Sequence, residues 1–406
     1  MFQFGYNLGI RFYSFIVVLA SVFNEKAKKR VGGYRVTLEE IKPKKNDFKR
    51  IWFHCASLGE FEQGRPLIER YKNDSAWEVY VSFFSPSGFE VIEKKKMLEN
   101  QFYLMPDTKK NAQKTIDKLN PDLVVFVKYE FWANHVFEIA KRNIPLYCIS
   151  GLFRENQIYF RYRFFASVLK CFDHFFVQDE KSSKLLAQID LKQVSVTGDT
   201  RFDRVTEGAR KAVSIDLVEF FLNGEKAFLV GSSWPDDEKH LFPLLQHPEF
   251  NHKTIIAPHE IGKKHLKEIK EILGEKAVFY SHYTKEATSD FQFLIIDNIG
   301  MLSNLYQYGE LAYIGGAFHG ALHNILEPAA FGLPVIFGPN FKKFPEGDRF
   351  IEAGIGFSVS DEKQLYAVYK QLIEGDHKSK VLEFVERNVG ATDQIYSVLS
   401  KRSKDQ

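Results

Sequence analysis

The stretch GELAYIGGAFHGALHNILEPAAFGLPVIFGP, residues 309–339, carries the strongest fold signal in the chain. It runs from a β-rich segment through a glycine-rich turn and a helix start to a Gly-Leu-Pro turn and a second β-rich segment. Gly315, Gly316 and Gly320 allow the backbone to approach a ligand closely, and the helix that follows directs its first N–H groups at an anion such as phosphate. The stretch therefore predicts an α/β unit with a phosphate site at its turn, with an ordinary solvated turn as the alternative.

A wider pattern of the same kind covers most of the chain. From about residue 48, and again from near residue 226, short β-rich runs alternate with amphipathic helical stretches. This alternation predicts parallel strands joined by helices. The polar segment TGDTRFDRV, residues 197–205, separates the two series. We expect an α/β protein with two doubly wound, Rossmann-like domains that face a central cleft, over residues 24–203 and 204–385, and a C-terminal helix and tail over 386–406.

Composition excludes several classes of protein. With 406 residues, 45% of them hydrophobic and 26% charged, the chain is long and apolar enough for two or three globular domains. The 55 Lys and Arg against 52 Asp and Glu leave a net charge of +3, too small to predict nucleic-acid binding. The three cysteines fit neither a disulfide framework nor a zinc site, and the sequence has no Walker loop, H-E-x-x-H motif or acidic cluster. We expect no dependence on a metal ion.

The N-terminal segment has the composition of a membrane-binding helix. Residues 1–23 carry one charge, Arg11, and a basic cluster follows them at residues 26–30. Because Arg11 interrupts the apolar run, both an anchor that spans the bilayer and a helix that lies in its interface are compatible with the pattern. The position of the basic cluster predicts that the downstream chain stays on the cytoplasmic side. A packed first helix and a cleaved signal are the alternatives.

Polar residues recur where predicted strands end. Glu60 follows the run RIWFHCAS at a helix entry, and Glu130 follows DLVVFVKY. A carboxylate at such a position can act as a general base, although a first-turn Glu that stabilises its helix dipole has the same pattern. Ser232 and Ser233 precede a helix, where N-capping is the alternative to ligand binding. His259 ends another strand, where a structural histidine is equally compatible.

One helical turn in the glycine-rich stretch combines an amide with a carboxylate. Asn324 and Glu327 lie about one turn apart. At that spacing Glu327 could accept hydrogen bonds from a ribose diol, while Asn324 and His323 face the phosphate or the sugar.

Taken together, these motifs resemble those of the Kdo transferases, the lipid A-modifying 3-deoxy-D-manno-octulosonic acid (Kdo) transferases of the GT-B glycosyltransferase fold. The similarity runs over nearly the whole chain, and the motifs agree in order and spacing. The matching positions in the first half are Ser57, Gly59 and Glu60; Ser85 to Gly88; Glu130 and Trp132; and Gly198, Asp199, Arg201, Phe202 and Asp203. Those in the second half are Ser232 and Ser233; Ile256 to Pro258; Ile299, Gly300 and Met301; and His323, Asn324, Leu326, Glu327 and Pro328.

The resemblance implies a role for each of these site residues. Glu60 would be the general base, with Glu130 and Arg201 as further catalytic residues. The residues implied in binding CMP and the donor are Ser232, Ser233, His259, Glu260, Ile299, Gly300, Met301, His323, Asn324, Ile325, Leu326 and Glu327. His259 stands where the family commonly has Arg, so an imidazole would replace a guanidinium near the donor.

The activity implied is transfer of Kdo, with inversion, from CMP-Kdo to a lipid A precursor (lipid IVA) in lipopolysaccharide core biosynthesis. The expected location is the cytoplasmic face of the inner membrane, with no cofactor, no nucleic acid and no obligate protein partner. Two alternatives stay open. One is another GT-B enzyme that uses a UDP- or GDP-sugar on a lipid acceptor, and the other is a noncatalytic membrane-bound scaffold of the same fold.

Overall fold

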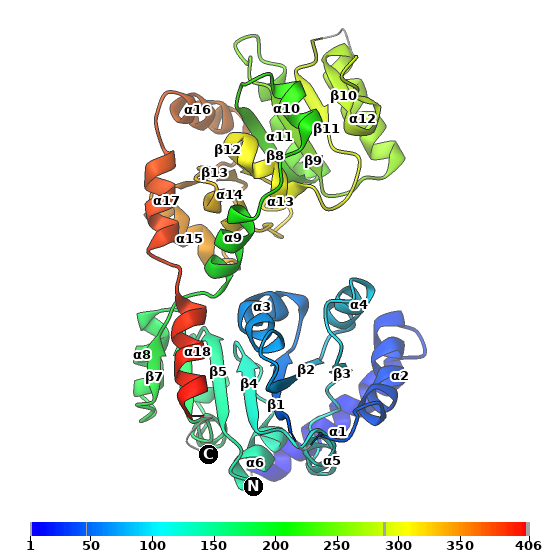
Figure 1. Cartoon of the computed structure of the whole chain (residues 1–406), viewed down its shortest axis with the longest axis vertical. Helices are drawn as coiled ribbons and strands as arrows, with labels where there is room; N and C mark the ends of the chain where they lie inside the picture. The colour runs from blue at the N-terminus through cyan, green and yellow to red at the C-terminus, as the bar shows by residue number, and fades with distance from the viewer. Residues whose placement is uncertain (1, 46, 287–289, 403–406) are drawn as a thin grey trace. The chain divides into compact units, whose positions relative to one another are not determined.

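The computed structural model describes residues 2–45, 47–286 and 290–402. The chain forms two compact units (Figure 1), unit 1 over residues 1–203 and 390–406 and unit 2 over 204–389. It passes from unit 1 to unit 2 inside helix α9 (Arg201–Arg210) and returns just before α18 (Ala391–Arg402). The return lies a few residues beyond the limit of 385 expected from the sequence, because α17 (Lys378–Glu386) packs on α14 (Leu326–Ala330) of unit 2.

Unit 1 is built on a seven-stranded sheet of order β3-β2-β1-β4-β5-β6-β7, in which neighbouring strands are parallel. Its strands are β1 (Lys49–Cys55), β2 (Trp77–Phe83), β3 (Gln101–Tyr103), β4 (Leu123–Val127), β5 (Leu146–Gly151), β6 (His174–Val177) and β7 (Val194–Val196). Its helices, besides α18, are α1 (Phe2–Ala20), α2 (Glu25–Glu39), α3 (Leu58–Lys72), α4 (Pro86–Lys94), α5 (Lys109–Leu119), α6 (Ala133–Lys141), η1 (Ile158–Phe160), α7 (Arg163–Leu169) and α8 (Glu180–Ala187).

Unit 2 repeats this architecture with a parallel sheet of order β10-β11-β9-β8-β12-β13-β14. Its strands are β8 (Ala227–Ser233), β9 (Thr254–Pro258), β10 (Ala277–Phe279), β11 (Phe293–Ile295), β12 (Gly309–Ile314), β13 (Val335–Phe337) and β14 (Gly356–Ser358). Its remaining helices are α10 (Asp216–Leu222), α11 (Pro235–Leu245), α12 (Lys263–Leu273), η2 (Gly274–Lys276), η3 (Tyr280–His282), α13 (Leu302–Leu305), η4 (Tyr306–Tyr308), α15 (Pro345–Glu352) and α16 (Glu362–Ile373). The prediction of two doubly wound α/β domains is confirmed.

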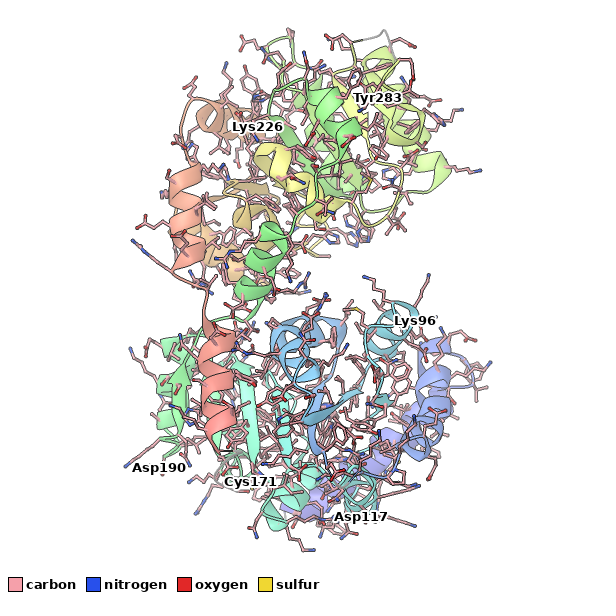
Figure 2. The ribbon with its side chains drawn as sticks, viewed as in Figure 1. Lys96, Asp117, Cys171, Asp190, Lys226 and Tyr283 are labelled. Carbon is pink, nitrogen blue, oxygen red and sulfur yellow. The ribbon has the colours of Figure 1, made fainter. Side chains whose placement is uncertain are left out.

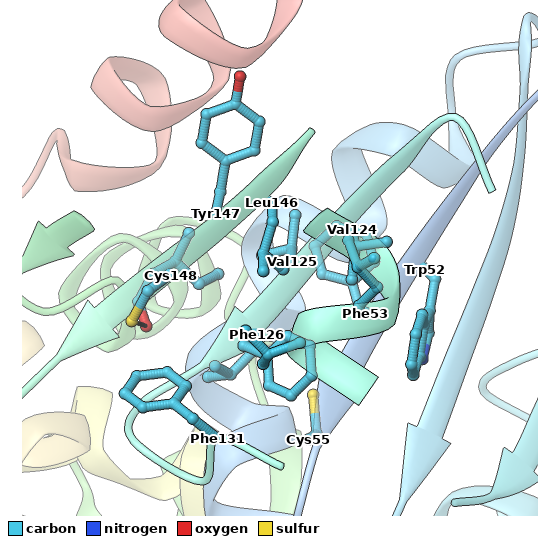
Figure 3. Packing of buried hydrophobic residues seen from close by; sticks show 14 of the residues in the cluster. Trp52, Phe53, Cys55, Val124, Val125, Phe126, Phe131, Leu146, Tyr147 and Cys148 are labelled. Atoms are coloured by element: carbon cyan, nitrogen blue, oxygen red, sulfur yellow. Dashed lines mark hydrogen bonds between the residues drawn. The ribbon is translucent and has the colours of Figure 1, made fainter. Parts of the chain in front are cut away.

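The central strands of unit 1 are buried on both faces. Every residue of β4, which reads Leu-Val-Val-Phe-Val, is buried. A strand with no solvent-facing side needs helices on both faces of its sheet, which is why the run is continuously apolar instead of alternating. Figure 3 shows Trp52 and Phe53 of β1 packed beside Val124 and Phe126 of β4 in this core. The ring centroids of Trp52 and Phe126 lie 5.9 Å apart.

Helix α1 has two different faces. Its outward face exposes large apolar side chains at helical spacing, among them Phe4, Phe12 and Phe15, which are 74%, 65% and 64% exposed. On the inward side, the Tyr6 hydroxyl donates to Asp107 Oδ2 at 2.6 Å. Among the described residues, no single helix has the length and hydropathy of a membrane span; α1 and residues 25–34 meet both criteria only as a pair, bent by 119°. The alternative of a first helix packed on the protein therefore applies only to the inward side of α1.

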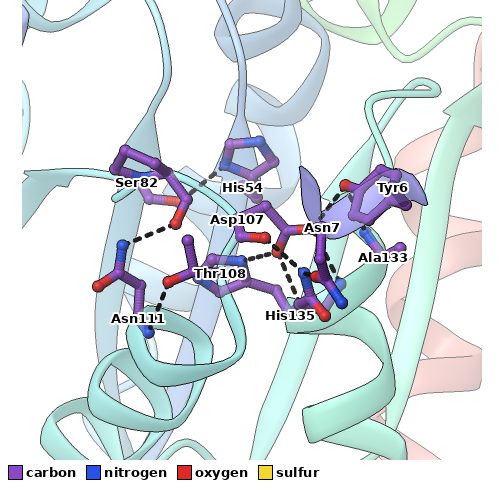
Figure 4. Close-up of polar contacts among 11 residues, drawn as sticks. Tyr6, Asn7, His54, Ser82, Asp107, Thr108, Asn111, Ala133 and His135 are labelled. Carbon is purple, nitrogen blue, oxygen red and sulfur yellow. Dashed lines mark hydrogen bonds and ion pairs between the residues drawn. The ribbon is translucent and has the colours of Figure 1, made fainter. Parts of the chain in front are cut away.

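A buried carboxylate joins α1 to the sheet of unit 1 (Figure 4). Asp107, 1% exposed, accepts from Tyr6, from the backbone N–H groups of Asn134 and His135 at 2.9 Å, and from His135 Nδ1 at 2.5 Å. Burial alone would raise the pKa of Asp107, but the hydrogen bonds from His135 and Tyr6 outweigh it and hold this pKa below its ordinary value. Asp107 therefore stabilises the fold at neutral pH, and this contribution is lost as the pH falls through its lowered pKa.

We expect Asp107→Asn to lower the free energy of unfolding of unit 1 by about 3 kcal/mol at neutral pH, because a neutral amide breaks a buried, charge-assisted network. The matched control is Asp117→Asn. Asp117 points outward (Figure 2), is 64% exposed and pairs with Arg142 on the surface. Its replacement should stay within about 0.5 kcal/mol of the parent. Urea unfolding followed by circular dichroism measures both, and equal effects would contradict a special role for Asp107.

Candidate active-site residues in the two units

Two carboxyl groups, the buried Glu60 and the half-buried Glu130, lie at the carboxyl ends of neighbouring strands of unit 1. Glu60 sits in the first turn of α3, directly after β1, is 7% exposed, and accepts a hydrogen bond from Ser57 N at 3.1 Å. Glu130 follows β4, which pairs with β1. Its Oε2 is buried and has no hydrogen-bond partner among the described residues. The structure thus confirms that both carboxyl groups belong to one edge of the sheet, as their positions after strands predict.

The surroundings of this carboxyl pair favour its neutral forms. Burial raises the pKa of Glu60 to about 7, repulsion by Glu130 adds to the rise, and the ammonium of Lys128 opposes it. Burial also raises the pKa of Glu130, against the attraction of Arg30. A carboxyl group with a pKa near 7 can take up and release a proton at neutral pH, which is the property that a general base requires.

Arg201 is held by its own motif. Its Nε and Nη2 donate to Asp199 Oδ2 at 3.0 and 2.7 Å, and Asp199 is 2% exposed. Asp203, two residues further on, accepts from Gly390 N at 2.5 Å and from the Thr392 hydroxyl at 2.6 Å, so it fixes the point where the chain returns to unit 1. The GDTRFD motif therefore stabilises the structure of unit 1. The catalytic role of Arg201 stays a prediction.

In unit 2, the buried Asp237 forms hydrogen bonds with the loops that follow strands β8 and β12. Asp237 Oδ2 accepts from Trp234 N at 2.9 Å and from Gly316 N at 2.8 Å, and its Oδ1 accepts from the Tyr313 hydroxyl at 2.8 Å. A Cβ atom on Gly315 would lie 2.3 Å from the carbonyl oxygen of Ser232, so the close approach of these loops requires glycine there. The glycine-rich turn after β12 is thus packed against the loop after β8.

The two serines of this loop differ. Ser233 is fully buried, and its hydroxyl donates to Glu238 Oε1 at 2.9 Å. Glu238 also accepts from His265 Nε2 at 2.8 Å. The hydroxyl of Ser233 therefore already has a hydrogen-bond partner within the protein. The sequence did not reveal this bond, because a glutamate in the first turn of a helix is also explained by its interaction with the helix dipole. Ser232 is half-buried and has a left-handed backbone with φ 53°, a conformation that non-glycine residues seldom adopt away from functional loops.

His259 and His323 come together around a tryptophan. His259 stacks on Trp234 with ring centroids 4.2 Å apart, and His323 lies 4.5 Å from His259. The indole N–H of Trp234 donates to His323 Nε2 at 3.2 Å. Burial lowers the pKa of His323 to about 4, and repulsion by His259 adds to this, so His323 is neutral at pH 7. Sequence reasoning missed Trp234, although it sits between Ser233 and the helix; its flat ring beside two histidines makes a stacking surface.

Glu327 begins helix α14 with two polar neighbours. Its Oε1 accepts from Asn324 Nδ2 at 3.0 Å and from Arg204 Nη2 at 3.4 Å. The predicted contacts of Glu327 with a ribose and of Asn324 with a phosphate or sugar stay predictions. Ile325 and Leu326 are fully buried, so only their backbone could face a ligand.

Three further residues predicted to bind the donor, Ile299, Gly300 and Met301, form a turn before α13. A fourth, Glu260, makes a hydrogen bond through its backbone carbonyl group. Ile299 is 87% exposed, Gly300 has φ +97°, and Met301 precedes α13. Glu260 is exposed, and its carbonyl oxygen accepts from His265 Nδ1 at 2.9 Å. Over the residues that the structure describes, no group of three or more His, Cys, Asp or Glu side chains could hold a metal ion.

Comparison with known proteins gives this arrangement a family. Residues 25–204 match the family model described as 3-Deoxy-D-manno-octulosonic-acid transferase (kdotransferase). The 3-deoxy-D-manno-octulosonic acid transferase of Chlamydophila psittaci is 26% identical over 350 residues, which cover 83% of this chain and 79% of that protein. The enzyme of the same name from Aquifex aeolicus is 25% identical over 349 residues, which cover 84% of this chain and 90% of that protein.

A solved structure shares the fold alone. The UDP-GlcNAc 2-epimerase from Neisseria meningitidis superposes with a TM-score of 0.58 at 14% identity, covering 87% of this chain and 100% of that one. Fold and sequence agree: the chain is a diverged relative of the 3-deoxy-D-manno-octulosonic acid transferases and a glycosyltransferase of the GT-B fold.

Proposed function

We propose that this protein transfers Kdo from CMP-Kdo to a hydroxyl group of a lipid A precursor, with inversion at the ketosidic carbon. The observation that carries the proposal is the carboxyl pair of unit 1, in which the buried Glu60 has a pKa of about 7. A single displacement needs one base to remove the proton of the acceptor hydroxyl, and the kinship with Kdo transferases supplies the donor class.

In the proposed reaction, the Glu60 carboxylate takes the proton from the acceptor hydroxyl as its oxygen attacks the ketosidic carbon. The bond from that carbon to the phosphate oxygen breaks, and its electron pair leaves on CMP. Attack from the face opposite the leaving group inverts the centre. Glu130, with its raised pKa and its unpartnered Oε2, can orient the acceptor by a hydrogen bond. No step in this scheme requires a metal ion.

Residues of unit 2 have the chemical groups needed to bind the nucleotide part of the donor. The Glu327 carboxylate can accept hydrogen bonds from the ribose hydroxyls, and the aromatic surface of Trp234 and His259 can contact a flat ring. Arg204, which donates to Glu327, holds that carboxylate in place. His259 supplies an imidazole where the family commonly has a guanidinium, so a ring N–H replaces that group near the anionic donor.

We expect Glu60→Gln to lower kcat by about 10²–10⁴, because the amide has nearly the same shape but cannot accept the proton. In the parent, kcat/KM should rise as the pH increases through about 7, where Glu60 ionises to the active base. Radiolabelled Kdo transfer measures kcat at saturating acceptor and kcat/KM at acceptor concentrations well below KM. The control Glu62→Gln changes a neighbouring carboxylate of the same helix, which pairs with Arg65. Parental turnover in Glu60→Gln would exclude Glu60 as the base.

We expect Glu327→Ala to weaken CMP binding by roughly 1–3 kcal/mol, because hydrogen bonds from the ribose to a charged group are lost. Isothermal titration calorimetry should show CMP binding to the parent and much weaker binding of UDP. Glu268→Ala, a change at a 53% exposed carboxylate of α12, is the control and should leave CMP binding unchanged. Equal affinity for CMP and UDP would point to another nucleotide-sugar donor, and unchanged CMP affinity in Glu327→Ala would remove Glu327 from the site.

We further propose that α1 attaches the enzyme to the cytoplasmic face of the inner membrane and lies in the bilayer interface. The bond from Tyr6 to Asp107 holds one side of α1 against unit 1, while its apolar side is exposed. The basic cluster at residues 26–30 offers fewer exposed positive charges to a lipid surface than its composition suggests. Arg30 is 7% exposed and lies over the Phe84 ring at 3.3 Å, so Lys26, Lys28 and Lys29 are the cations that remain exposed.

The double variant Phe12→Glu/Phe15→Glu should release the protein from vesicles that contain anionic lipid, since charges on this side of α1 oppose burial in the interface. Deleting residues 1–23 would also remove Tyr6 from Asp107, whereas the double variant separates attachment from folding. Vesicle flotation is the measurement. Phe220→Glu, at a 42% exposed Phe of α10, is the control. Flotation of the double variant at the parental level would place the attachment elsewhere.

A further inference from the structure

Unit 1 contains an apolar cavity of about 520 Å³ beneath α1. Its walls come from three parts of the chain: Tyr6 and Ile10 of α1, the segment from Tyr129 to Trp132 after β4, and residues 156–159 with Phe165 around η1 and α7. This volume lies in the range of sites for small molecules. The cavity is therefore large enough for a ligand and lies wholly within unit 1.

Two residues of its lining, Glu130 and Trp132, each carry a buried polar atom that lacks a hydrogen bond to any described residue. Glu130 Oε2 and Trp132 Nε1 are both buried, and neither has a hydrogen-bond partner among the residues that the structure describes. Buried polar groups in folded proteins are nearly always hydrogen-bonded, so a matching donor and acceptor are missing here. A mainly apolar ligand with one carbonyl and one N–H or hydroxyl group would satisfy the indole and the carboxyl group together.

The position of the cavity connects the carboxyl pair with the exposed apolar helix. Glu130 lines the cavity and interacts electrostatically with Glu60. Tyr6 and Ile10 line it from the inward side of the helix whose outward side carries Phe4, Phe12 and Phe15. The cavity therefore lies between the inward side of α1 and Glu130, one member of the carboxyl pair.

We infer that this cavity binds one acyl chain of the lipid acceptor, with the linkage that joins the chain to the sugar beside Trp132 and Glu130. The inference rests on the proposed function. It assigns the specificity for an acylated acceptor to the walls of the cavity, Ile10, Ile158 and Phe165 among them. Burial of the chain is favoured by the removal of its methylene groups from water.

The first test fills the cavity. Ile158→Trp adds bulk at a wall residue that is 43% exposed, so the fold should tolerate it. We expect the ratio of kcat/KM for the acylated acceptor to that for the acceptor stripped of its acyl chains to fall by at least about tenfold. The matched control is Ile272→Trp on α12, where the isoleucine is 44% exposed, and it should keep the parental ratio. A parental ratio in Ile158→Trp, or an equal fall in both variants, would overturn the inference.

The second test measures binding without activity. The probe is N-(2-bromophenyl)decanamide, a neutral amide with one carbonyl and one N–H group, whose bromine lies next to that linkage and quenches a tryptophan beside it. We expect saturable quenching of the intact protein that Trp132→Phe abolishes, while Trp234→Phe retains it. Quenching that survives Trp132→Phe would overturn the assignment to this cavity. If the parent transfers Kdo to neither acceptor while the probe binds as expected, the proposed function fails and the cavity assignment stands.

Discussion

Parallel strand pairing is the constraint on which the rest of the structure depends. In both sheets each strand pairs parallel with its neighbours, so the chain must cross back over the sheet between strands, and every strand ends at the same edge. The loops that follow the strands therefore gather there. Glu60 after β1 and Glu130 after β4 meet for this reason, although 70 positions separate them in the numbering (130 − 60). Ligand-binding residues of open α/β sheets collect at this edge on the same grounds.

Burial at that edge changes the chemistry of ordinary side chains. A glutamate in water is ionised well below neutrality, whereas Glu60 has a pKa of about 7 because it is desolvated beside a second carboxyl group. The positive charges of Arg30 and Lys128 moderate the cost of burying the pair. In unit 2 the same physics keeps His323 neutral, so its ring accepts a hydrogen bond from Trp234.

Helix α1 has two different sides in a single amphipathic element. Its inward side enters a buried network through Tyr6, and its outward side leaves phenylalanine rings in solvent. Exposed apolar patches of this kind usually mark a binding surface. The cavity on the inward side is lined by Tyr6 and Ile10 of this helix and by Glu130.

The sequence by itself determined the elements and their order: apolar runs fix the strands, glycines fix the tight turns, and a strand end followed by a helix start fixes where Glu60 and Asn324 lie. These are local properties, set by neighbours a few residues away. Tertiary structure alone decided which partner each side chain meets. Ser233 donates to Glu238, Arg201 is held by Asp199, and Arg30 lies over Phe84, so each has a contact that the motif did not reveal. The stack of Trp234 on His259 and the cavity beneath α1 likewise arise from loops that are distant in sequence, because packing brings together residues that no local pattern relates.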